Sequence, residues 1–511
     1  MVASRPPRIS MLGDLKAAGY RAVSVKDEMR SNLIRKLQAG EEVFPGILGF
    51  ERTVIPQLQN AILARHDFIL LGLRGQAKSR MVRLLPTLLD EWMPYIAGSE
   101  LYDDPLAPVS RFGREAIVES GDATAIEWLH RSERYGEKLA TPDTTIADLV
   151  GDIDPIKAAT QKLSYADERV IHYGIIPRTN RGIFAINELP DLQPRIQVGL
   201  LNIMEEQDIQ IRGFQLRIPL DIVMVFTANP EDYTNRGSII TPLKDRIDSQ
   251  ILTHYPKSID IGVAITAQEA WQDRDGAPAV HIPHYVREII EQIAFEARES
   301  EYIDQKSGVS ARLTRAALED LISAAERRAI VNGESETTVR IGDLHHVEPA
   351  ITGKVELVYE GEQEGAQHVA RVLVGRAVAS IFKRYFPDPA AKGEGDQGRA
   401  AFAKILGWFS KGNTVDLSPD MAFEPYAQAL DRVDGLRKFV KKHSDPGTPA
   451  ETASAMEFVL EALHQHSLVG KDALVEQTSY SDIMGSVLGS LGSFGGDDDD
   501  DDFEDYRRRY G

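Results

Sequence analysis

An apolar segment that ends in an asparagine and a glutamate, GIFAINEL at residues 182–189, contains the residue types most suggestive of chemistry. A phosphoryl-transfer site of the P-loop type places two acids after a hydrophobic strand. The first holds a magnesium-bound water and the second orients the attacking water. Here Asn187 takes the first position and Glu188 the second. Asn187 can still accept a hydrogen bond, but it brings no negative charge to a metal. The alternative interpretation is a buried strand that ends in a polar turn.

A second candidate segment is HDFILLGLRGQAKSRMVRLL, residues 66–85. An apolar strand leads into a glycine-bearing turn, then Lys78 and Ser79, then a helix. Such a loop aims backbone N–H groups at phosphate oxygens, while the lysine neutralises phosphate charge and the hydroxyl binds Mg²⁺. Gly72 opens the loop, but Ala77 replaces the last glycine of the pattern. Alanine is tolerable at this position if its φ is negative, because only a positive φ strongly penalises a Cβ. An ordinary strand-turn-helix connection is the alternative.

Three further polar residues follow in the chain. Asn229 directly follows the apolar segment IVMVFTA (222–228), and the carboxyl ends of strands are where α/β sheets place ligand-contacting groups. Arg246 lies in the helical stretch that follows, and Arg312 opens a long helical pattern from which it could fold back onto a bound phosphate. An Asn-Pro turn and two surface ion pairs are the ordinary alternatives.

The elements that must position these residues form an α/β protein. Helical stretches alternate with short apolar strands over residues 46–255, which predicts a mostly parallel sheet. Residues 256–350 have the pattern of a small helical lid domain, and residues 351–490 that of an all-α extension. Residues 1–45 are predicted to be an N-terminal helical arm. The acidic residues 491–511 are predicted to be a disordered tail, because a block of like charge cannot form a core.

Two helical patterns carry an apolar face that must pack against another element or a partner. In the N-terminal arm, Val25, Met29, Leu33 and Leu37 recur every four residues after the potential cap Ser24. A second apolar face lies in the extension beyond the lid. It is predicted to pack against the lid, and the alternative is a docking face for a partner. Its residues are Ala370, Val374, Ala377 and Ile381. The adjacent histidines 345 and 346 have no recognised ligand spacing and are interpreted as ordinary lid residues.

The composition excludes several classes of protein. Formal net charge is −20, with 58 Lys and Arg against 78 Asp and Glu, which argues against a nucleic-acid-coating surface. No apolar run approaches the roughly 20 residues that span a bilayer, and the first residues lack a signal-peptide core. With no cysteine, the chain has no disulfide, thiol nucleophile or zinc-thiolate site. We expect a cytoplasmic protein that does not bind membranes.

Taken in order, these segments resemble the AAA+ ATPases, specifically the MoxR and magnesium-chelatase ATPase-subunit branch. The resemblance runs from about residue 46 to about residue 351. Its branch-specific part is TPDTTIADLVGDIDPIKA followed by YGIIPRTNRGIFAINELPDL, with DIQIRGFQLRIPLDIVMVFTANPED after it. The fold implied is an AAA+ P-loop core with a parallel sheet and a helical lid.

The resemblance also implies a role for each candidate residue, with ATP and Mg²⁺ as ligands. Glu188 is the catalytic glutamate of Walker B, Asn229 is sensor 1, and Arg312 is the sensor 2 arginine. Arg246 is the arginine finger that acts on a neighbouring subunit, with Arg236 as a second candidate. The magnesium side comprises Ser79 and Asn187. The Walker A loop comprises Gly72, Gly75, Gln76, Ala77, Lys78 and Ser79.

Two departures from the family pattern, Ala77 and Asn187, lie around the phosphates and the metal. Losing one acid near the metal predicts roughly 10–100-fold weaker magnesium affinity. Because Lys78, Glu188 and both sensors remain, we expect a slow but real ATPase. A scaffold that assembles with ATP but barely hydrolyses it is the alternative.

Members of this branch act as ring motors, so the resemblance implies a homo-oligomer, hexameric by analogy, that remodels a protein client. It also implies a partner with a von Willebrand A domain in trans, because this chain has no D-x-S-x-S metal motif of its own. A magnesium chelatase ATPase subunit proper is a further alternative. A sigma-54 activator is disfavoured, because GAFTGA is absent and no helix-turn-helix is evident.

Overall fold

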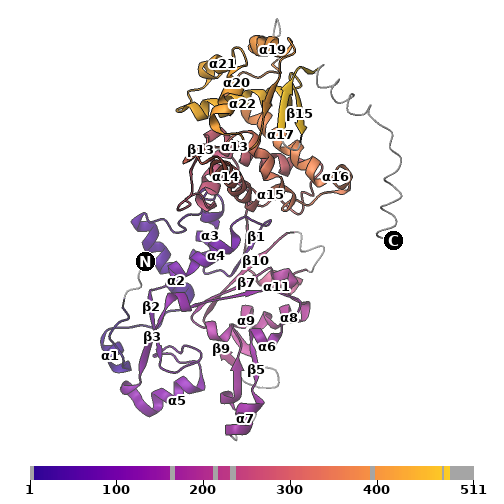
Figure 1. Ribbon diagram of the computed structural model, residues 1–511. Helices are drawn as coiled ribbons and strands as arrows, with labels where there is room; N and C mark the ends of the chain where they lie inside the picture. The colour runs from indigo at the N-terminus through magenta and orange to yellow at the C-terminus, as the bar shows by residue number, and fades with distance from the viewer. Residues whose placement is uncertain are drawn as a thin grey trace. The chain divides into compact units, whose positions relative to one another are not determined.

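The computed structural model describes residues 5–161, 167–210, 217–230, 238–391, 397–474 and 477–483. The chain forms two compact units that meet in sequence between Tyr255 and Pro256. The acidic tail lies outside the described residues. Figure 1 shows the helices and strands of both units with their labels.

Unit 1 is built on a parallel five-stranded sheet, which confirms the predicted α/β class. Its strands, in spatial order, are β11 (Ser249–Leu252), β1 (Phe68–Leu71), β10 (Ile222–Ala228), β7 (Gly182–Asn187) and β4 (Tyr135–Leu139). The sequence patterns identified the three central strands, β1, β7 and β10. They missed both edge strands, because YGEKL and SQIL are short and partly polar.

Three helices that flank the first strand cover one face of the sheet: α2 (Val25–Ala39), α3 (Val54–Leu63) and α4 (Lys78–Leu84). The predicted cap of α2 is present, since the Ser24 side chain accepts a hydrogen bond from the Asp27 N–H. Val25, Met29 and Leu33 are buried in the same core as the odd-numbered residues of β7 and β10, whereas Leu37 is exposed. The helix predicted as an N-terminal arm therefore packs directly on the sheet.

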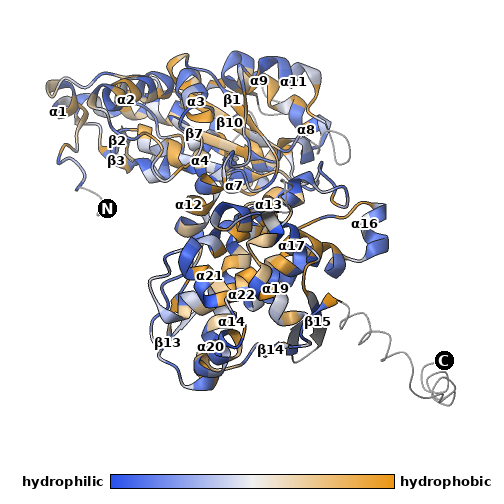
Figure 2. Ribbon diagram, turned by 90° about the horizontal axis from the view of Figure 1, so that it is seen from above, coloured by the Kyte–Doolittle hydropathy of each residue, from blue (hydrophilic) through white to orange (hydrophobic). Residues whose placement is uncertain are grey.

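The opposite face of the sheet is covered by α8 (Pro194–Gly199), α9 (Leu201–Glu206) and α11 (Thr241–Arg246), as Figure 1 shows. Even-numbered residues of β7 and β10, including Phe184 and Phe226, point into this second core. Because both faces are covered, the central strands are apolar along nearly their whole length, and Figure 2 shows β7 and β10 in the hydrophobic colour.

Smaller elements complete unit 1. An antiparallel pair joins β2 (Trp92–Ile96) to β3 (Ile126–His130). Two further antiparallel pairs join β5 (Gly151–Ile153) to β6 (Ile171–Tyr173) and β8 (Asp208–Gln210) to β9 (Arg217–Pro219). The accompanying helices are α1 (Leu12–Ala17), α5 (Arg111–Ser120), α6 (Ile146–Leu149) and α7 (Pro155–Gln161).

Unit 2 is mainly helical and has one continuous apolar core. Its longest helices are α13 (His284–Glu299), α14 (Arg312–Asn332), α17 (Ala366–Tyr385) and α22 (Pro449–Gln465). The core includes Leu321 of the predicted lid and Ile381 of the predicted extension, so these two parts share one interior. In the described part of this unit, the other helices of eight or more residues are α12 (Ile259–Glu269), α20 (Phe423–Asp431) and α21 (Leu436–His443).

In unit 2 the structure adds a sheet that the sequence did not predict, and it shows what the apolar face of α17 contacts. A small antiparallel sheet of β14 (Val415–Leu417), β16 (Gln477–Ser481) and β15 (Gly470–Leu474) accompanies the predicted helices of the C-terminal part. The apolar face of α17 packs against α13 and α22, with Ala370, Ala377 and Ile381 buried. This face is therefore part of the core, and it does not form a docking surface.

Candidate functional site

The candidate residues of unit 1 gather at one edge of the sheet, where β1, β10 and β7 end. The register places Leu71 beside Ala228 and Phe226 beside Ile186. The loop after β1 and the polar residues that follow β7 and β10 therefore emerge from adjacent strands on the same edge. Carboxyl ends of adjacent parallel strands are where α/β proteins bind ligands.

The loop between β1 and α4 is compact and closes around its own lysine. The Gly72 N–H donates to the Ala228 carbonyl at 3.2 Å, which continues the pairing of β1 with β10. Gly75 has a φ of 76°, a conformation that glycine adopts without strain. The Lys78 ammonium donates to the carbonyl oxygens of Gly72 and, at 3.0 Å, of Leu73. The charge of Lys78 thus lies inside the loop, next to the carboxyl end of β1.

Residues that follow the edge strand β11 anchor this loop. The Thr253 hydroxyl donates to Gln76 Oε1 at 2.6 Å, and Tyr255 Oη donates to the Arg74 carbonyl at 2.9 Å. A Cβ at Gly72 would lie 1.8 Å from Thr253 Oγ1, so only glycine fits there. The Gln76 side chain, which is 6% exposed, therefore holds the loop to the sheet from within.

The condition under which alanine would fit without strain at position 77, a negative φ, is not met. Ala77 has φ 55° and ψ 14°, the left-handed conformation. A Cβ in this region crowds the following carbonyl oxygen and costs roughly 1–2 kcal/mol. The chain therefore retains the backbone shape that a glycine would take at this position, with a residue that strains it.

The end of β7 brings Asn187 and Glu188 beside a buried threonine of β10. The Thr227 hydroxyl donates to Asn187 Oδ1 at 3.0 Å and accepts from the Glu188 N–H at 3.3 Å. Glu188 has φ 54° and ψ 52°, so the chain turns sharply where the strand ends. Left-handed residues other than glycine cluster at functional sites, where the surrounding structure compensates their strain.

A carboxylate from the other edge strand reaches the same place. Glu137 Oε1 of β4 accepts a hydrogen bond from Asn187 Nδ2 at 2.5 Å. Arg83 of α4 donates to both oxygens of Glu137, at 2.9 and 3.1 Å, and the Tyr135 hydroxyl donates at 3.1 Å. Partial burial raises the pKa of Glu137, but the hydrogen bonds from Arg83, Tyr135 and Asn187 outweigh it and hold that pKa below its ordinary value. Glu137 is therefore ionised at neutral pH.

Asn229 lies one residue beyond β10, and its Oδ1 atom is buried. No donor reaches this atom among the described residues. A buried polar atom without a partner costs on the order of 1–3 kcal/mol, so a ligand that supplies a donor would be favoured there. Arg236, the second finger candidate, lies outside the described residues.

Of the two remaining arginines, Arg246 lies apart from this group of residues and Arg312 belongs to the other unit. Arg246, the last residue of α11, forms an ion pair with Glu205 of α9 on the surface of unit 1. Arg312 begins α14 in unit 2, and its N–H donates to Ser310 Oγ at 3.1 Å. Because Arg312 belongs to the other unit, its relation to the residues of unit 1 stays a prediction.

The structure also bears on metal sites and membranes. No group of three or more His, Cys, Asp or Glu residues is arranged to hold a metal within the described ranges. His345 pairs with Glu348 at 2.8 Å, in line with an ordinary lid residue. None of the described helices is both long enough and apolar enough to cross a membrane.

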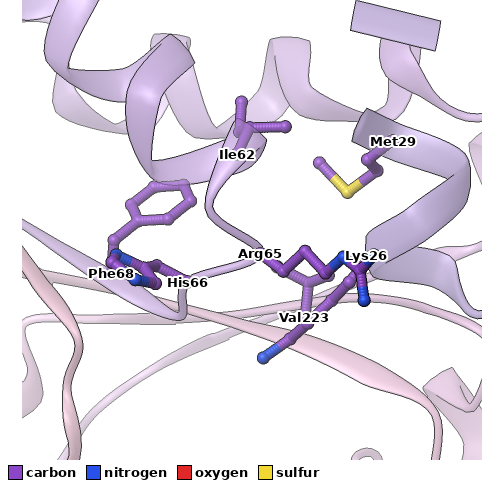
Figure 3. A pocket seen from close by; sticks show the side chains of 7 residues that line it. All are labelled: Lys26, Met29, Ile62, Arg65, His66, Phe68 and Val223. Atoms are coloured by element: carbon purple, nitrogen blue, oxygen red, sulfur yellow. The ribbon is translucent and has the colours of Figure 1, made fainter. Parts of the chain in front are cut away.

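A small cavity in unit 1 lies at the other end of the sheet. Figure 3 shows it between α2, the end of α3 and the sheet, with Lys26, Met29, Arg65 and Phe68 among its lining residues. Phe68 opens β1, and Val223 lies at the start of β10. The cavity is thus at the amino ends of the strands, a strand length away from the candidate site.

Comparison with solved structures gives distant similarities. No family model matches the chain. NtrX from Brucella abortus aligns at 13% identity and a TM-score of 0.34, over 58% of this chain and 55% of that one. A putative ATPase from Cytophaga hutchinsonii aligns at 16% identity and a TM-score of 0.28, over 71% of this chain and 97% of that one.

The complex between subunits BchI and BchD of magnesium chelatase gives a third match, at 19% identity and a TM-score of 0.33, over 63% of this chain and 98% of that one. The alignment with NtrX thus spans little more than half of that protein. Scores of this size carry no functional conclusion, so the case for function rests on the residues at the sheet edge.

Sequence reasoning missed two residues that hold this site together, Glu137 and Thr253. Both sit in or directly after an edge strand that the patterns did not identify. The signal for Glu137 was the short alternation in YGEKL, where Tyr135 and Glu137 share a face. For Thr253 the signal was a β-branched residue directly after SQIL.

Proposed function

We propose that this protein is an ATP-binding and ATP-hydrolysing ring motor of the AAA+ class, of the MoxR and magnesium-chelatase type, that remodels or activates a protein client. One observation carries the proposal. The loop that holds Lys78 and the polar ends of β7 and β10 emerge side by side from one edge of a parallel sheet. A phosphate-binding loop, a water-orienting acid and a phosphate-sensing amide require this arrangement.

Each residue has a role in this proposal. Backbone N–H groups of the loop after Gly72, up to Ser79, hold the phosphates, and Lys78 leaves its loop carbonyls to neutralise them. Glu188 orients the attacking water. Asn229 bridges that water and the terminal phosphate, which would give its buried Oδ1 a donor.

The residues on this edge suit magnesium. Mg²⁺ prefers oxygen ligands, and it is usually held by one or two protein groups together with phosphate oxygens and water. The Ser79 hydroxyl and the Asn187 side-chain oxygen are oxygen donors of this kind. When bound, the ion neutralises charge that develops on the phosphates. Asn187 brings no charge of its own, and the proposed ATPase is therefore slow.

Assembly and partners follow from the same proposal. Arg246, on the surface of unit 1, is the finger that reaches a neighbouring subunit's ATP in a ring, taken as a hexamer. Arg312 is the sensor of the helical unit. A von Willebrand A-domain protein in trans is the proposed partner, and a magnesium chelatase ATPase subunit is the narrower form of the same function.

The test is to measure Mg-ATP binding by calorimetry and phosphate release for the wild type, Lys78→Ala and Glu188→Gln. We expect the wild type to bind and turn over slowly, Lys78→Ala to lose binding, and Glu188→Gln to bind but lose at least 100-fold in turnover. Thr87→Val, in the same unit, is the control. Binding and assembly without phosphate release would replace the motor by the nucleotide-gated scaffold. An absence of ATP binding would refute both.

A further inference from the structure

The side chains of Asn187 and Glu137 form one unit at the end of β7 and β4. Both lie on the sheet face covered by α4, because Glu137 pairs in register with Ala185, two residues before Asn187. Asn187 is 8% exposed, so its amide cannot rely on water for its hydrogen bonds. Its two ends have different partners: Oδ1 accepts from Thr227 and Nδ2 donates to Glu137.

These partners fix the orientation of the Asn187 amide. An ionised carboxylate only accepts hydrogen bonds, so the nitrogen must face Glu137. The oxygen then faces Thr227 and the end of the strand, and it keeps a second lone pair for a further donor. Glu137 is itself held from the other side by the two hydrogen bonds of Arg83 and by Tyr135.

The position tolerates one carboxylate in this pair and no more. An aspartate at 187 would place its oxygen where the amide nitrogen now lies, 2.5 Å from Glu137 Oε1. Two carboxylates in such contact cannot both stay ionised without a large cost. An aspartate at 187 on β7 would need a neutral residue at 137 on β4. This chain has the reverse arrangement, with neutral Asn187 on β7 and the acid Glu137 on β4.

We propose that Glu137 is the positioning carboxylate of the magnesium site: it orients the Asn187 amide and supplies, from the neighbouring strand, the negative charge that an aspartate at 187 would supply. The inference rests on the proposed nucleotide site. It also explains Asn187, because the site keeps one carboxylate, which Glu137 supplies from β4 where an aspartate at 187 would supply it from β7.

The test measures how strongly Mg²⁺ tightens nucleotide binding. For each protein, the dissociation constant of a fluorescent ATP analogue is measured with excess Mg²⁺ and with EDTA, and the ratio of the two is the readout. The variants are Glu137→Gln, Asn187→Asp and the double variant. Glu127→Gln is the matched control, since it removes a hydrogen-bonded strand carboxylate from β3, outside the five-stranded sheet.

We expect Glu137→Gln to reduce the magnesium ratio about 10-fold or more, as is usual when a group that supports a metal ligand is removed. Asn187→Asp alone should give no gain, because the two acids repel each other. The double variant should recover the wild-type ratio or exceed it. The ratio is formed within one protein, so a fraction of misfolded material does not change it.

Two outcomes would overturn the inference while leaving the nucleotide site intact. One is a wild-type magnesium ratio in Glu137→Gln, with Glu127→Gln also unchanged. The other is a gain in Asn187→Asp that the double variant does not increase. If the wild type binds no ATP analogue in either buffer, the proposed function itself fails, and this result is distinct from both.

Discussion

The hydroxyl of Thr253 donates to Gln76 Oε1 at 2.6 Å, and this bond ties the loop after β1 to the edge strand β11. Thr253 also donates its N–H to the Leu71 carbonyl at 2.7 Å, so the end of β1 and the loop share one support. The shape of the candidate phosphate loop therefore depends on a residue far outside it.

Thr253→Val removes the hydroxyl and keeps the size of the side chain. We expect about 1 kcal/mol lower unfolding free energy, because buried Gln76 loses its donor, together with several-fold weaker ATP binding. Denaturant unfolding and nucleotide titration measure the two effects. The control is Thr87→Val, whose hydroxyl donates within its own helical turn, to the Leu84 carbonyl. Equal behaviour of the two variants would show that the loop does not need Thr253.

Ala77→Gly should stabilise the protein. Glycine relieves the left-handed strain at φ 55°, and we expect the unfolding free energy to rise by about 1 kcal/mol. Ala116→Gly, in the middle of α5, is the opposite control and should cost about 1 kcal/mol. Chemical denaturation of both variants beside the wild type decides the matter. Loss of stability in Ala77→Gly would mean that the loop is not strained there.

Arg246 gives a test of action between subunits. If it acts in trans, Arg246→Ala and Glu188→Gln should each abolish phosphate release while retaining ATP binding. Mixing the two inactive proteins should restore part of the activity, because an intact Glu188 then meets an intact Arg246 from its neighbour. Glu205→Gln, which removes the ion-pair partner of Arg246, should stay active. A mixture that stays inactive after subunit exchange would count against the finger assignment.

Asp221 predicts a pH dependence of stability. Its carboxylate accepts the Val25 N–H at the start of α2, and burial raises its pKa from 3.8 to about 6. Arg181 and Arg134 oppose this shift, and Glu28 adds to it. Between about pH 4 and 6 the folded state thus holds the proton that the unfolded state has released, so the unfolding free energy contributed by this group falls as pH rises.

The unfolding free energy that Asp221 contributes falls by at most about 3 kcal/mol over this range, from roughly 2 pH units at 1.36 kcal/mol each. Asp221→Asn removes this contribution. The difference in unfolding free energy between the wild type and Asp221→Asn, measured from pH 4 to pH 7, should therefore shift against the wild type as pH rises. Parallel curves for the two proteins would contradict the assignment.

The sequence by itself determined the local units of the site. A run of apolar residues between turn residues predicted β1, β7 and β10, because burial on both faces of a parallel sheet needs such runs. The types of Lys78, Ser79, Glu188 and Asn229 predicted phosphate chemistry, because charge and hydrogen-bonding capacity belong to the residue itself. The cap of α2 and the four-residue spacing of its apolar side chains were also predicted, but the sequence did not show that this face packs on the sheet.

Only the tertiary structure decided how these units meet. The bond from Asn187 to Glu137 spans 50 residues, and that from Thr253 to Gln76 spans 177. Edge strands bury little apolar surface, so their sequences carry a weak pattern, and the residues they contribute were missed. The sign of φ at Ala77 was likewise set by the loop that closes around Lys78. Local residue patterns decide which elements form, whereas packing over long sequence distances decides which side chains touch.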